Sequence, residues 1–267
     1  MCGRYASSRS PEDIVEEFEV LDPRLERAIA PSWNVAPTDE VYAVLERQPR
    51  NESGEHEGDP VRQLRAVRWG LVPSWAKDTS IGSRMINARM ETVAEKPAFR
   101  KAFASRRCIV PADGYFEWYD TERKDAKGKQ VKQPFFITPG DGSILPMAGL
   151  YEIWRDRSVP PDAPEAFRWT CTVLTTEATD ELGQIHDRMP LLVDRASRAA
   201  WLDPRETIGD LSALLTPAQQ SGLTAYPVST AVGNVRNNGP ELVEPLPIDG
   251  AGGPADGDAY DGQGTLL

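Results

Sequence analysis

Apolar and polar residues alternate along much of this chain, which is typical of β-strands with one buried face. The alternating runs are short and are separated by clusters of Gly, Pro, Asn and Asp, the residues that favour turns. The pattern therefore predicts a mostly β protein. The expected strands are Val41–Leu45, Leu64–Trp69, Arg107–Val110, Gly114–Trp118, Pro134–Thr138, Leu145–Trp154, Trp169–Thr175 and Ala225–Val228.

Helical spacing is confined to a few short segments. The run Ser10–Asp13 offers a serine N-cap, a proline at the first helical position and an acidic residue three positions after the cap. Ile14, Val15 and Phe18 follow at helical spacing, so a short surface helix is expected here. The other helical patterns cover 99–103, Arg195–Leu202 and Thr207–Leu215.

The segments between these elements are strongly polar. Gln48–Pro60, which contains His56, is rich in Glu and Gly and predicts a solvated loop, and Lys124–Lys132 predicts a polar hairpin tip. From Asp249 onward the chain is mostly Gly, Asp and Ala, a composition typical of disorder. Without an internal repeat or a linker before it, the sequence predicts one α+β domain over 1–248 and an acidic tail over 249–267.

Composition narrows the functional classes. No apolar run reaches the roughly 20 residues of a membrane helix, and no secretory signal opens the chain, so a cytoplasmic protein is expected. Three cysteines without a Cys-x-x-Cys spacing and two histidines argue against a disulfide framework and a metal centre. Cys108 and Cys171 are expected to be buried apolar residues.

Charge gives a mixed signal about nucleic acids. The 30 basic and 41 acidic residues give a net charge of −11, which by itself argues against a nucleic-acid partner. Basic residues are nevertheless frequent in the first 110 positions, so a local basic groove in an acidic protein remains open. Those close to the motifs described below are Arg4, Arg65, Arg68, Arg84, Arg89, Arg100, Lys101, Arg106 and Arg107.

Cys2 is the most informative residue for chemistry. Removal of Met1 is usual before a small second residue, and it would leave an α-amine and a thiol on adjacent carbons. An amine with a pKa near ~8 and a thiol near ~8.5 are both reactive at neutral pH, and with an aldehyde they can form a Schiff base and then a thiazolidine ring. The alternative is an ordinary residue next to a start codon.

Glu117 and His186 are candidates for proton transfer. Phe116 and Trp118 share one face of the expected strand, so Glu117 points to the other face beside Tyr115 and Tyr119. A partly desolvated carboxyl group there would have a raised pKa, whereas the alternative is an exposed strand glutamate. His186 is the only histidine outside the acidic loop, and a structural histidine is its alternative role.

Two further motifs contain candidate binding residues. Asn87 and Arg89 lie two positions apart, where anion binding and helix capping are both open. Trp69 and Trp75 flank a loop with Gly and Pro, and a tryptophan there can stack on a nucleobase or pack in the core.

Taken together, these motifs resemble the SRAP (SOS response-associated peptidase) family. The resemblance extends over about 235 residues in seven ordered segments, and together they are far more specific than any one alone. They are MCGRY at 1–5, WNVAPT at 33–38, WGLVPSW at 69–75, INARMET at 86–92, ADGYFEW at 112–118, IHDRMP at 185–190 and VGNV at 232–235. Ala76 stands where some members have a second tryptophan.

The resemblance implies a fold and a function. The fold is one mostly β α+β domain with barrel-like sheets and peripheral helices. The function is covalent capture of abasic sites in single-stranded DNA through a thiazolidine formed by Cys2, which shields the lesion and is accompanied by lyase or reversal chemistry. The implied roles are nucleophile for Cys2, sugar positioning for Asn87, proton relay for Glu117 and ring opening for His186, with DNA contacts from Arg4, Asn34, Pro37, Trp75, Arg89 and Arg188.

The same resemblance implies no cofactor or metal, a monomer in the cytoplasm that joins the nucleoid when bound to DNA, and a connection to the replication machinery and the SOS response. Two alternatives stay open. One is a thiol peptidase that uses Cys2 and His186 and acts on its own N-terminal segment. The other is a module that binds single-stranded DNA without chemistry.

Overall fold

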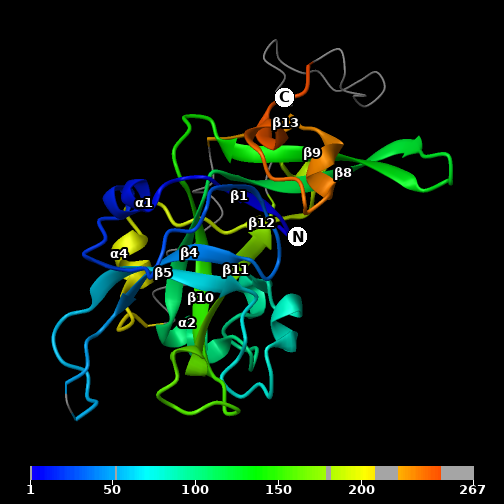
Figure 1. The fold of residues 1–267 in the computed structure, drawn as a ribbon. Helices are drawn as coiled ribbons and strands as arrows, with labels where there is room; N and C mark the ends of the chain where they lie inside the picture. The colour runs from blue at the N-terminus through cyan, green and yellow to red at the C-terminus, as the bar shows by residue number, and fades with distance from the viewer. Residues whose placement is uncertain (1, 52, 179–181, 208–221, 248–267) are drawn as a thin grey trace.

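A computed structural model describes residues 2–51, 53–178, 182–207 and 222–247. Two β-sheets dominate it, one above the other in Figure 1. The five-stranded sheet has the order β13-β9-β8-β1-β3, and its strands are β13 (Leu223–Pro227), β9 (Gln130–Pro139), β8 (Gly114–Lys124), β1 (Tyr5–Ser7) and β3 (Ser32–Val35). The β8–β9 hairpin projects from the body of the protein (Figure 1).

The second sheet has eight strands in the order β12-β11-β10-β7-β4-β5-β2, with β6 beside β11. Strand β11 also pairs with β5, through Thr170↔Arg68 and Cys171↔Trp69. The strands β11, β10, β7, β4 and β5 therefore form a closed, barrel-like ring. The bounds are β12 (Arg188–Pro190), β11 (Phe167–Glu177), β10 (Leu145–Arg155), β7 (Arg107–Ala112), β4 (Glu40–Arg47), β5 (Val61–Trp69), β2 (Asp22–Arg24) and β6 (Asn87–Arg89).

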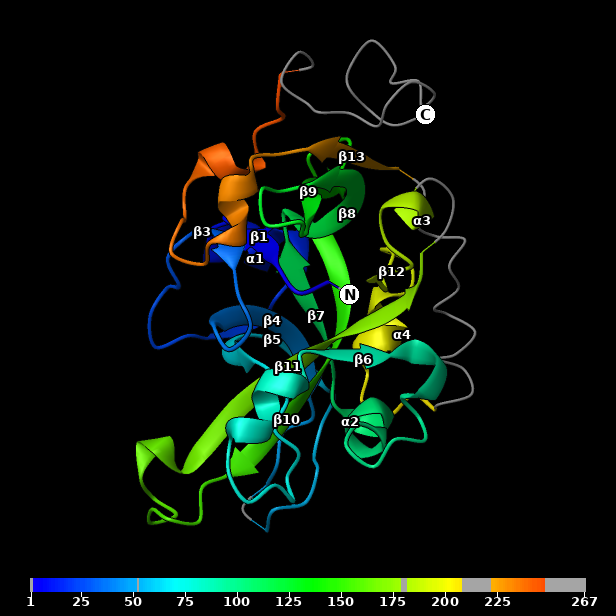
Figure 2. The ribbon, with the colours of Figure 1, turned by 90° about the vertical axis from the view of Figure 1, so that its right-hand side faces the viewer.

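Helices are short and peripheral (Figure 2). Ser10 and Asp13 form a reciprocal capping box at the start of α1 (Pro11–Glu17), as the sequence predicts. The other α-helices are α2 (Arg100–Ser105), α3 (Leu182–Ile185) and α4 (Arg198–Leu202), and the 3₁₀ helices are η1 (Ser80–Arg84), η2 (Met90–Thr92), η3 (Pro164–Ala166), η5 (Thr230–Gly233) and η6 (Pro240–Val243). Among the residues described, no helix is long and apolar enough to cross a bilayer.

The apolar core divides into three clusters. The largest lies inside the ring and reaches the five-stranded sheet, and it contains Cys2, Cys108 and Cys171, all fully buried. A second packs around Trp201 between the ring and the helices, and a third joins Phe116 to the segment that carries η5 and η6. Cys2 therefore lies where the two sheets meet.

All eight predicted strands are present, and the mostly β α+β class is confirmed. The hairpin tip is shorter than predicted, because β8 runs to Lys124, β9 starts at Gln130, and the Asp125 carboxylate accepts the Lys127 and Lys129 amides. The helix expected at Arg195–Leu202 begins only at Arg198. The helix expected at Thr207–Leu215, apart from its first residue, and the tail from Asp249 lie outside the described residues.

Candidate active site

Cys2 is placed by the strand that follows it. Strand β1 pairs antiparallel with β8 through Tyr5↔Tyr115, and the Phe116 amide donates to the Arg4 carbonyl at 2.9 Å. This register continues toward the start of the chain and sets Glu117 opposite Gly3. Burial, with a further contribution from the negative charge of Glu117, raises the pKa of the Cys2 thiol far above its usual range.

Glu117 is a buried carboxyl group in the middle of a strand. Phe116 and Trp118 pack in the cluster with η5 and η6, while Glu117 faces the side of Tyr115 and Cys2, so the predicted alternation is correct. The residue is only 3% exposed, and desolvation by burial raises its pKa to about 7. A group with this pKa can both give and take a proton near neutral pH.

His186 approaches Glu117 from the end of α3, which contacts β8. Its Nε2 lies 4.0 Å from Glu117 Oε2, and its Nδ1 accepts a hydrogen bond from the Arg188 amide at 3.0 Å. Burial lowers the pKa of His186, so the neutral ring with Nδ1 as acceptor carries its proton on Nε2, toward Glu117. Asp187 Oδ1 lies 2.8 Å from Nδ1 and can accept a hydrogen bond from the Nδ1–H group when the ring is charged.

Asn87 holds the backbone of Cys2. Strand β6 pairs in parallel with β11 through Asn87↔Val173, and the Asn87 Nδ2 group donates to the Cys2 carbonyl at 2.6 Å. The Asn87 Oδ1 atom is buried and accepts no hydrogen bond from any described residue. One side of this amide therefore fixes the nucleophile, and the other is available to a bound hydroxyl or amine.

Arg4 and Asn34 form one partly buried network. Arg4 Nη1 donates to Asn34 Oδ1 at 2.7 Å and to the Val232 carbonyl at 3.0 Å. The Asn34 amide group lies within hydrogen-bond distance of the carbonyls of Val232, Asn234 and Asn237. Asn34 is thus occupied by the protein and positions Arg4, whereas sequence reasoning grouped it with the DNA contacts. This segment lies beside β3 in Figure 2.

Arg188 and Arg89 differ sharply in their surroundings. Arg188 is buried, makes a bidentate pair with Glu91 at 2.8 and 3.0 Å, and donates to the Thr175 carbonyl. Arg89 is exposed at the opposite edge of β11, where it pairs with Thr175. Both motifs therefore meet at one end of β11, yet Arg89 is the more accessible cation.

Trp75 lies on a loop that is anchored to β11. The Gly70 amide donates to the Cys171 carbonyl at 2.8 Å, and the Val72 amide donates to Thr170 Oγ1 at 2.9 Å. Gly70 has a φ of +124°, and a Cβ atom there would lie 2.6 Å from the Gly82 carbonyl oxygen, so only glycine fits this close approach. The loop presents Trp75 to solvent with 60% of its surface exposed.

Pro37 lies in the turn between β3 and β4. The Asp39 carboxylate accepts the Ala36 amide at 2.8 Å, and Thr38 adopts a φ of +79°. This region of φ is costly for a β-branched residue, by about 1–3 kcal/mol, and such strain is typical of functional turns. The turn leaves Pro37 partly exposed, and the negative charge of Asp39 acts on Arg4.

Sequence reasoning missed two tyrosine hydroxyls. Tyr5 and Tyr115 are fully buried, and their hydroxyl groups accept or donate no hydrogen bond among the described residues. Burial raises the pKa of both, with a further contribution from the Cys2 sulfur, so both rings lie near that sulfur. Tyr115 was visible as a neighbour of Glu117 on the strand, whereas Tyr5 was visible only as the last residue of the segment MCGRY.

The acidic and thiol groups of this site do not form a metal centre. Among the residues that the structure describes, no three His, Cys, Asp or Glu side chains gather closely enough to hold an ion.

Comparisons with known proteins show which family this chain belongs to. Residues 1–235 match the family described as SOS response associated peptidase (SRAP). The chain is 39% identical over 245 residues to the abasic site processing protein YoqW of Bacillus subtilis, covering 91% of this chain and 99% of that protein. It is 34% identical over 254 residues to the abasic site processing protein YedK of Escherichia coli, covering 92% and 100%.

The fold also matches solved structures. A crystal structure of a protein from Bacteroides thetaiotaomicron superimposes with a TM-score of 0.70 at 23% identity, over 92% of this chain and 100% of that one. The sequence resemblance, the family match and the relatives all point the same way, and the chain belongs to the SRAP family.

Proposed function

We propose that this protein processes abasic sites in DNA by forming a covalent thiazolidine between Cys2 and the exposed sugar aldehyde. The observation that carries this proposal is the convergence of Cys2, Asn87, Glu117 and His186 at the junction of the two sheets. The names of the relatives support the substrate class, since they are abasic site processing proteins. Removal of Met1 is part of the proposal, because it frees the α-amine of Cys2.

The reaction balances without any co-reactant. The Cys2 amine attacks C1′ of the ring-opened deoxyribose, and the resulting carbinolamine loses one water molecule to give a Schiff base. The thiol then adds to the same carbon, its proton moves to the nitrogen, and the five-membered ring closes. The net change is aldehyde plus aminothiol to thiazolidine plus water, with no oxidation or reduction.

The surrounding residues fit separate steps. Glu117, with a pKa of about 7, gives a proton to the departing hydroxyl and takes one from the thiol. His186, neutral and with Nε2 toward Glu117, assists opening of the sugar ring. Asn87 acts as a positioning residue, because its amide fixes the Cys2 carbonyl and thereby the direction of attack.

The raised pKa of the Cys2 thiol favours this order of events over a thiol peptidase. A peptidase cysteine attacks as a thiolate and needs a lowered pKa. Here burial and the charge of Glu117 keep sulfur protonated in the resting site, whereas a neutral amine can attack first and the thiol can follow. The peptidase chemistry in the family name is therefore not part of the proposal.

Arg4 and Arg89 bind DNA phosphates near the lesion. Arg188 holds the neighbouring segments in place through its bonds to Glu91 and Thr175. Trp75 and Pro37 contact bases of a single strand. The net charge of −11 weakens ordinary DNA binding, because repulsion opposes the few phosphate contacts. A covalent bond keeps the protein on DNA when salt rises. Non-covalent encounter should therefore fall steeply with salt, while the formed adduct should survive.

The test uses a single-stranded oligonucleotide with one uracil, treated with uracil glycosylase and run with the protein on a denaturing gel. A shifted band is expected, and Cys2→Ser should abolish it while binding to DNA persists. A tetrahydrofuran analogue lacks the aldehyde and should give no band, so a covalent band with the analogue would contradict the proposal. Extra residues ahead of Cys2 should block crosslinking, because the α-amine becomes a peptide nitrogen. Full crosslinking by protein that retains Met1 would also overturn it.

A further inference from the structure

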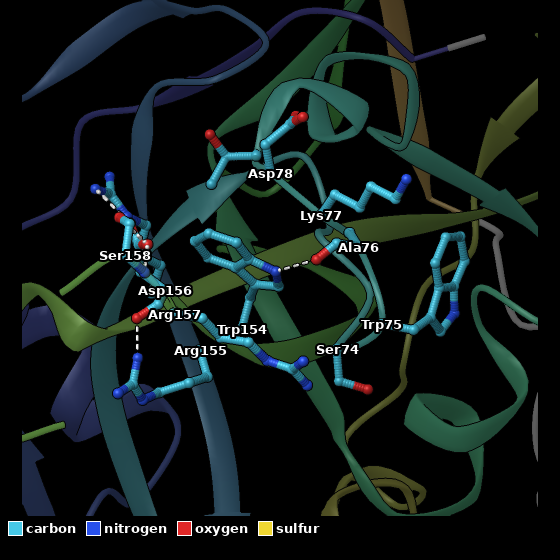
Figure 3. A pocket seen from close by; sticks show the side chains of 12 residues that line it. Ser74, Trp75, Ala76, Lys77, Asp78, Trp154, Arg155, Asp156, Arg157 and Ser158 are labelled. Atoms are coloured by element: carbon cyan, nitrogen blue, oxygen red, sulfur yellow. Dashed lines mark hydrogen bonds and ion pairs between the residues drawn. The ribbon is translucent and has the colours of Figure 1, made fainter. Parts of the chain in front are cut away.

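A cavity lies away from Cys2, between the loop that carries Trp75 and the turn that leaves β10. It encloses about 540 Å³ and is hereafter the flank pocket. Trp154 forms its floor, and the Trp154 indole donates to the Ala76 carbonyl at 2.8 Å (Figure 3). Trp75 stands at one side of the lining (Figure 3). The lining residues are Ser74–Thr79, Trp154–Ser158 and Arg168.

The charge of the flank pocket is opposite to that of the whole protein. Four basic and two acidic side chains line it, although the chain carries a net charge of −11. The basic residues are Lys77, Arg155, Arg157 and Arg168. A cavity that is locally positive in an acidic protein attracts an anion and raises its local concentration.

The two carboxylates are already engaged in shaping the pocket. Asp156 accepts hydrogen bonds from the Ser158 amide and hydroxyl at 3.0 and 2.6 Å, and Arg168 lies 3.7 Å from it. Asp78 accepts the Ser80 amide at 2.8 Å. These bonds fix the two loops and leave the carboxylates less able to neutralise the basic residues.

Two of the four basic side chains, in contrast, form no such hydrogen bonds or ion pairs among the described residues. Lys77 and Arg157 are exposed, and among the described residues neither forms an ion pair or a side-chain hydrogen bond. They come from opposite walls of the pocket, one from the Trp75 loop and one from the turn after β10. An exposed tryptophan beside unpaired cations is the combination that binds single-stranded nucleic acids, where the ring stacks on a base and the cations contact phosphates.

Strand β11 connects this pocket to the reaction centre. Arg168 lines the pocket, and Val173 pairs with Asn87, which holds Cys2. These positions are five residues apart on one strand, which is about 17 Å at a rise of ~3.3 Å per residue. At 3.4 Å per stacked nucleotide, this spans up to about five nucleotides.

We infer that the flank pocket is a nucleotide subsite, which receives a nucleotide several positions away from the abasic site, on one side of it. Its base lies against Trp75, and its phosphate lies between Lys77, Arg157 and Arg168. The inference rests on the proposed function, because abasic DNA supplies the strand. It adds that tight binding requires a minimum number of nucleotides on one side of the abasic site.

The test measures equilibrium binding of single-stranded oligonucleotides with a central tetrahydrofuran site, which cannot crosslink. One flank at a time is trimmed from about eight to about two nucleotides. Wild-type affinity should fall at least tenfold when one of the two flanks is trimmed. The double variant Lys77→Gln/Arg157→Gln should bind the long oligonucleotide at least tenfold more weakly than wild type and should be indifferent to trimming. Its slope of log affinity against log salt should be shallower by about 0.7 for each lost phosphate contact.

A matched control keeps the same change in net charge. Lys124 on the β8–β9 hairpin and Arg195 before α4 are both exposed and lie outside the pocket, so Lys124→Gln/Arg195→Gln should retain the wild-type flank dependence. Equal losses in the pocket and control variants would overturn the inference, as would a pocket variant that still responds to trimming.

A parallel crosslinking assay with true abasic DNA separates the two ideas. Crosslinking by wild type without any flank dependence would remove the subsite and leave the proposed function. Flank-dependent binding without any crosslink would leave the subsite and remove the proposed function. The result that supports both the subsite and the proposed function is a pocket variant that crosslinks more slowly than wild type to long DNA but at the wild-type rate to trimmed DNA.

Discussion

The Cys2 site and the flank pocket hold their charged groups in opposite ways. In the first, Glu117 and Arg188 are buried and fixed, and burial changes the pKa of the carboxyl group. In the second, Lys77 and Arg157 are exposed. Reaction steps need groups whose proton affinity is tuned by desolvation, whereas encounter with DNA needs charge that reaches solvent. Substitutions in the first region should change rate and stability, and substitutions in the second should change affinity and salt dependence.

Glu117→Gln should have the largest effect short of losing the nucleophile. Removing a general acid–base group costs about 10²–10⁴-fold in rate. We expect the rate of crosslinking to fall by at least 100-fold while affinity for tetrahydrofuran DNA stays within twofold. Equal losses of rate and affinity would show that Glu117 only shapes the binding surface.

The same residue should make stability depend on pH. The pKa of Glu117 is raised from 4.5 to about 7 in the folded protein, so the folded state binds the extra proton between these values. Stability should therefore fall as pH rises from about 4.5 to about 7, by about 3 kcal/mol. Urea unfolding at pH 5 and pH 8 measures this, and Glu117→Gln should reduce the difference. An unchanged difference in the variant would assign the pH dependence to other groups.

Trp75→Ala should weaken DNA binding and leave the fold intact. Stacking of a base on an aromatic ring contributes about 1–3 kcal/mol, so affinity for single-stranded DNA should fall about 5- to 150-fold. Since the side chain is 60% exposed, the free energy of unfolding should change by less than about 0.5 kcal/mol. Leu21→Ala, at a residue that is 78% exposed, is the control and should change neither quantity. Trp75→Ala with wild-type affinity would remove the stacking role.

The smallest effect expected is that of Glu91→Gln. Glu91 neutralises the buried Arg188 through two hydrogen bonds, but its side chain is 43% exposed. The loss should be about 1–2 kcal/mol in the free energy of unfolding, less than for a fully buried pair. Glu19→Gln, which removes an exposed ion pair with Arg195, should cost less than about 0.5 kcal/mol. Equal losses in the free energy of unfolding for the two variants would show that burial of Arg188 does not strengthen its ion pair with Glu91.

Local pattern predicted one part of this molecule well. Alternation in the strand around Phe116 and Trp118 was enough to turn Glu117 toward Cys2. Strands such as β1, β3 and β6 have only three or four residues, too few to show a period, and only pairing with distant strands makes them visible. The proximity of Cys2, Asn87 and His186 came from the family resemblance and not from spacing.

Contacts between residues far apart in the sequence could not be predicted from local pattern. Arg188 resembles a phosphate ligand in its motif, yet its partner Glu91 lies 97 positions away and accepts hydrogen bonds from both of its terminal nitrogens. Asn34 is likewise occupied by carbonyl groups about 200 positions later. The flank pocket joins the Trp75 loop to a turn that belongs to no motif, so nothing in the local sequence marks it.

The bonds from Asn34 and Arg4 to residues 232–237 act as a latch between the two ends of the described chain. A proteolytic cut after Pro227 would leave Cys2, Asn87, Glu117 and His186 untouched and yet unfasten the segment on which Arg4 rests. Damage at a site remote from the chemistry would thereby inactivate the protein, so the segment after Pro227 must stay intact for the amino terminus to function.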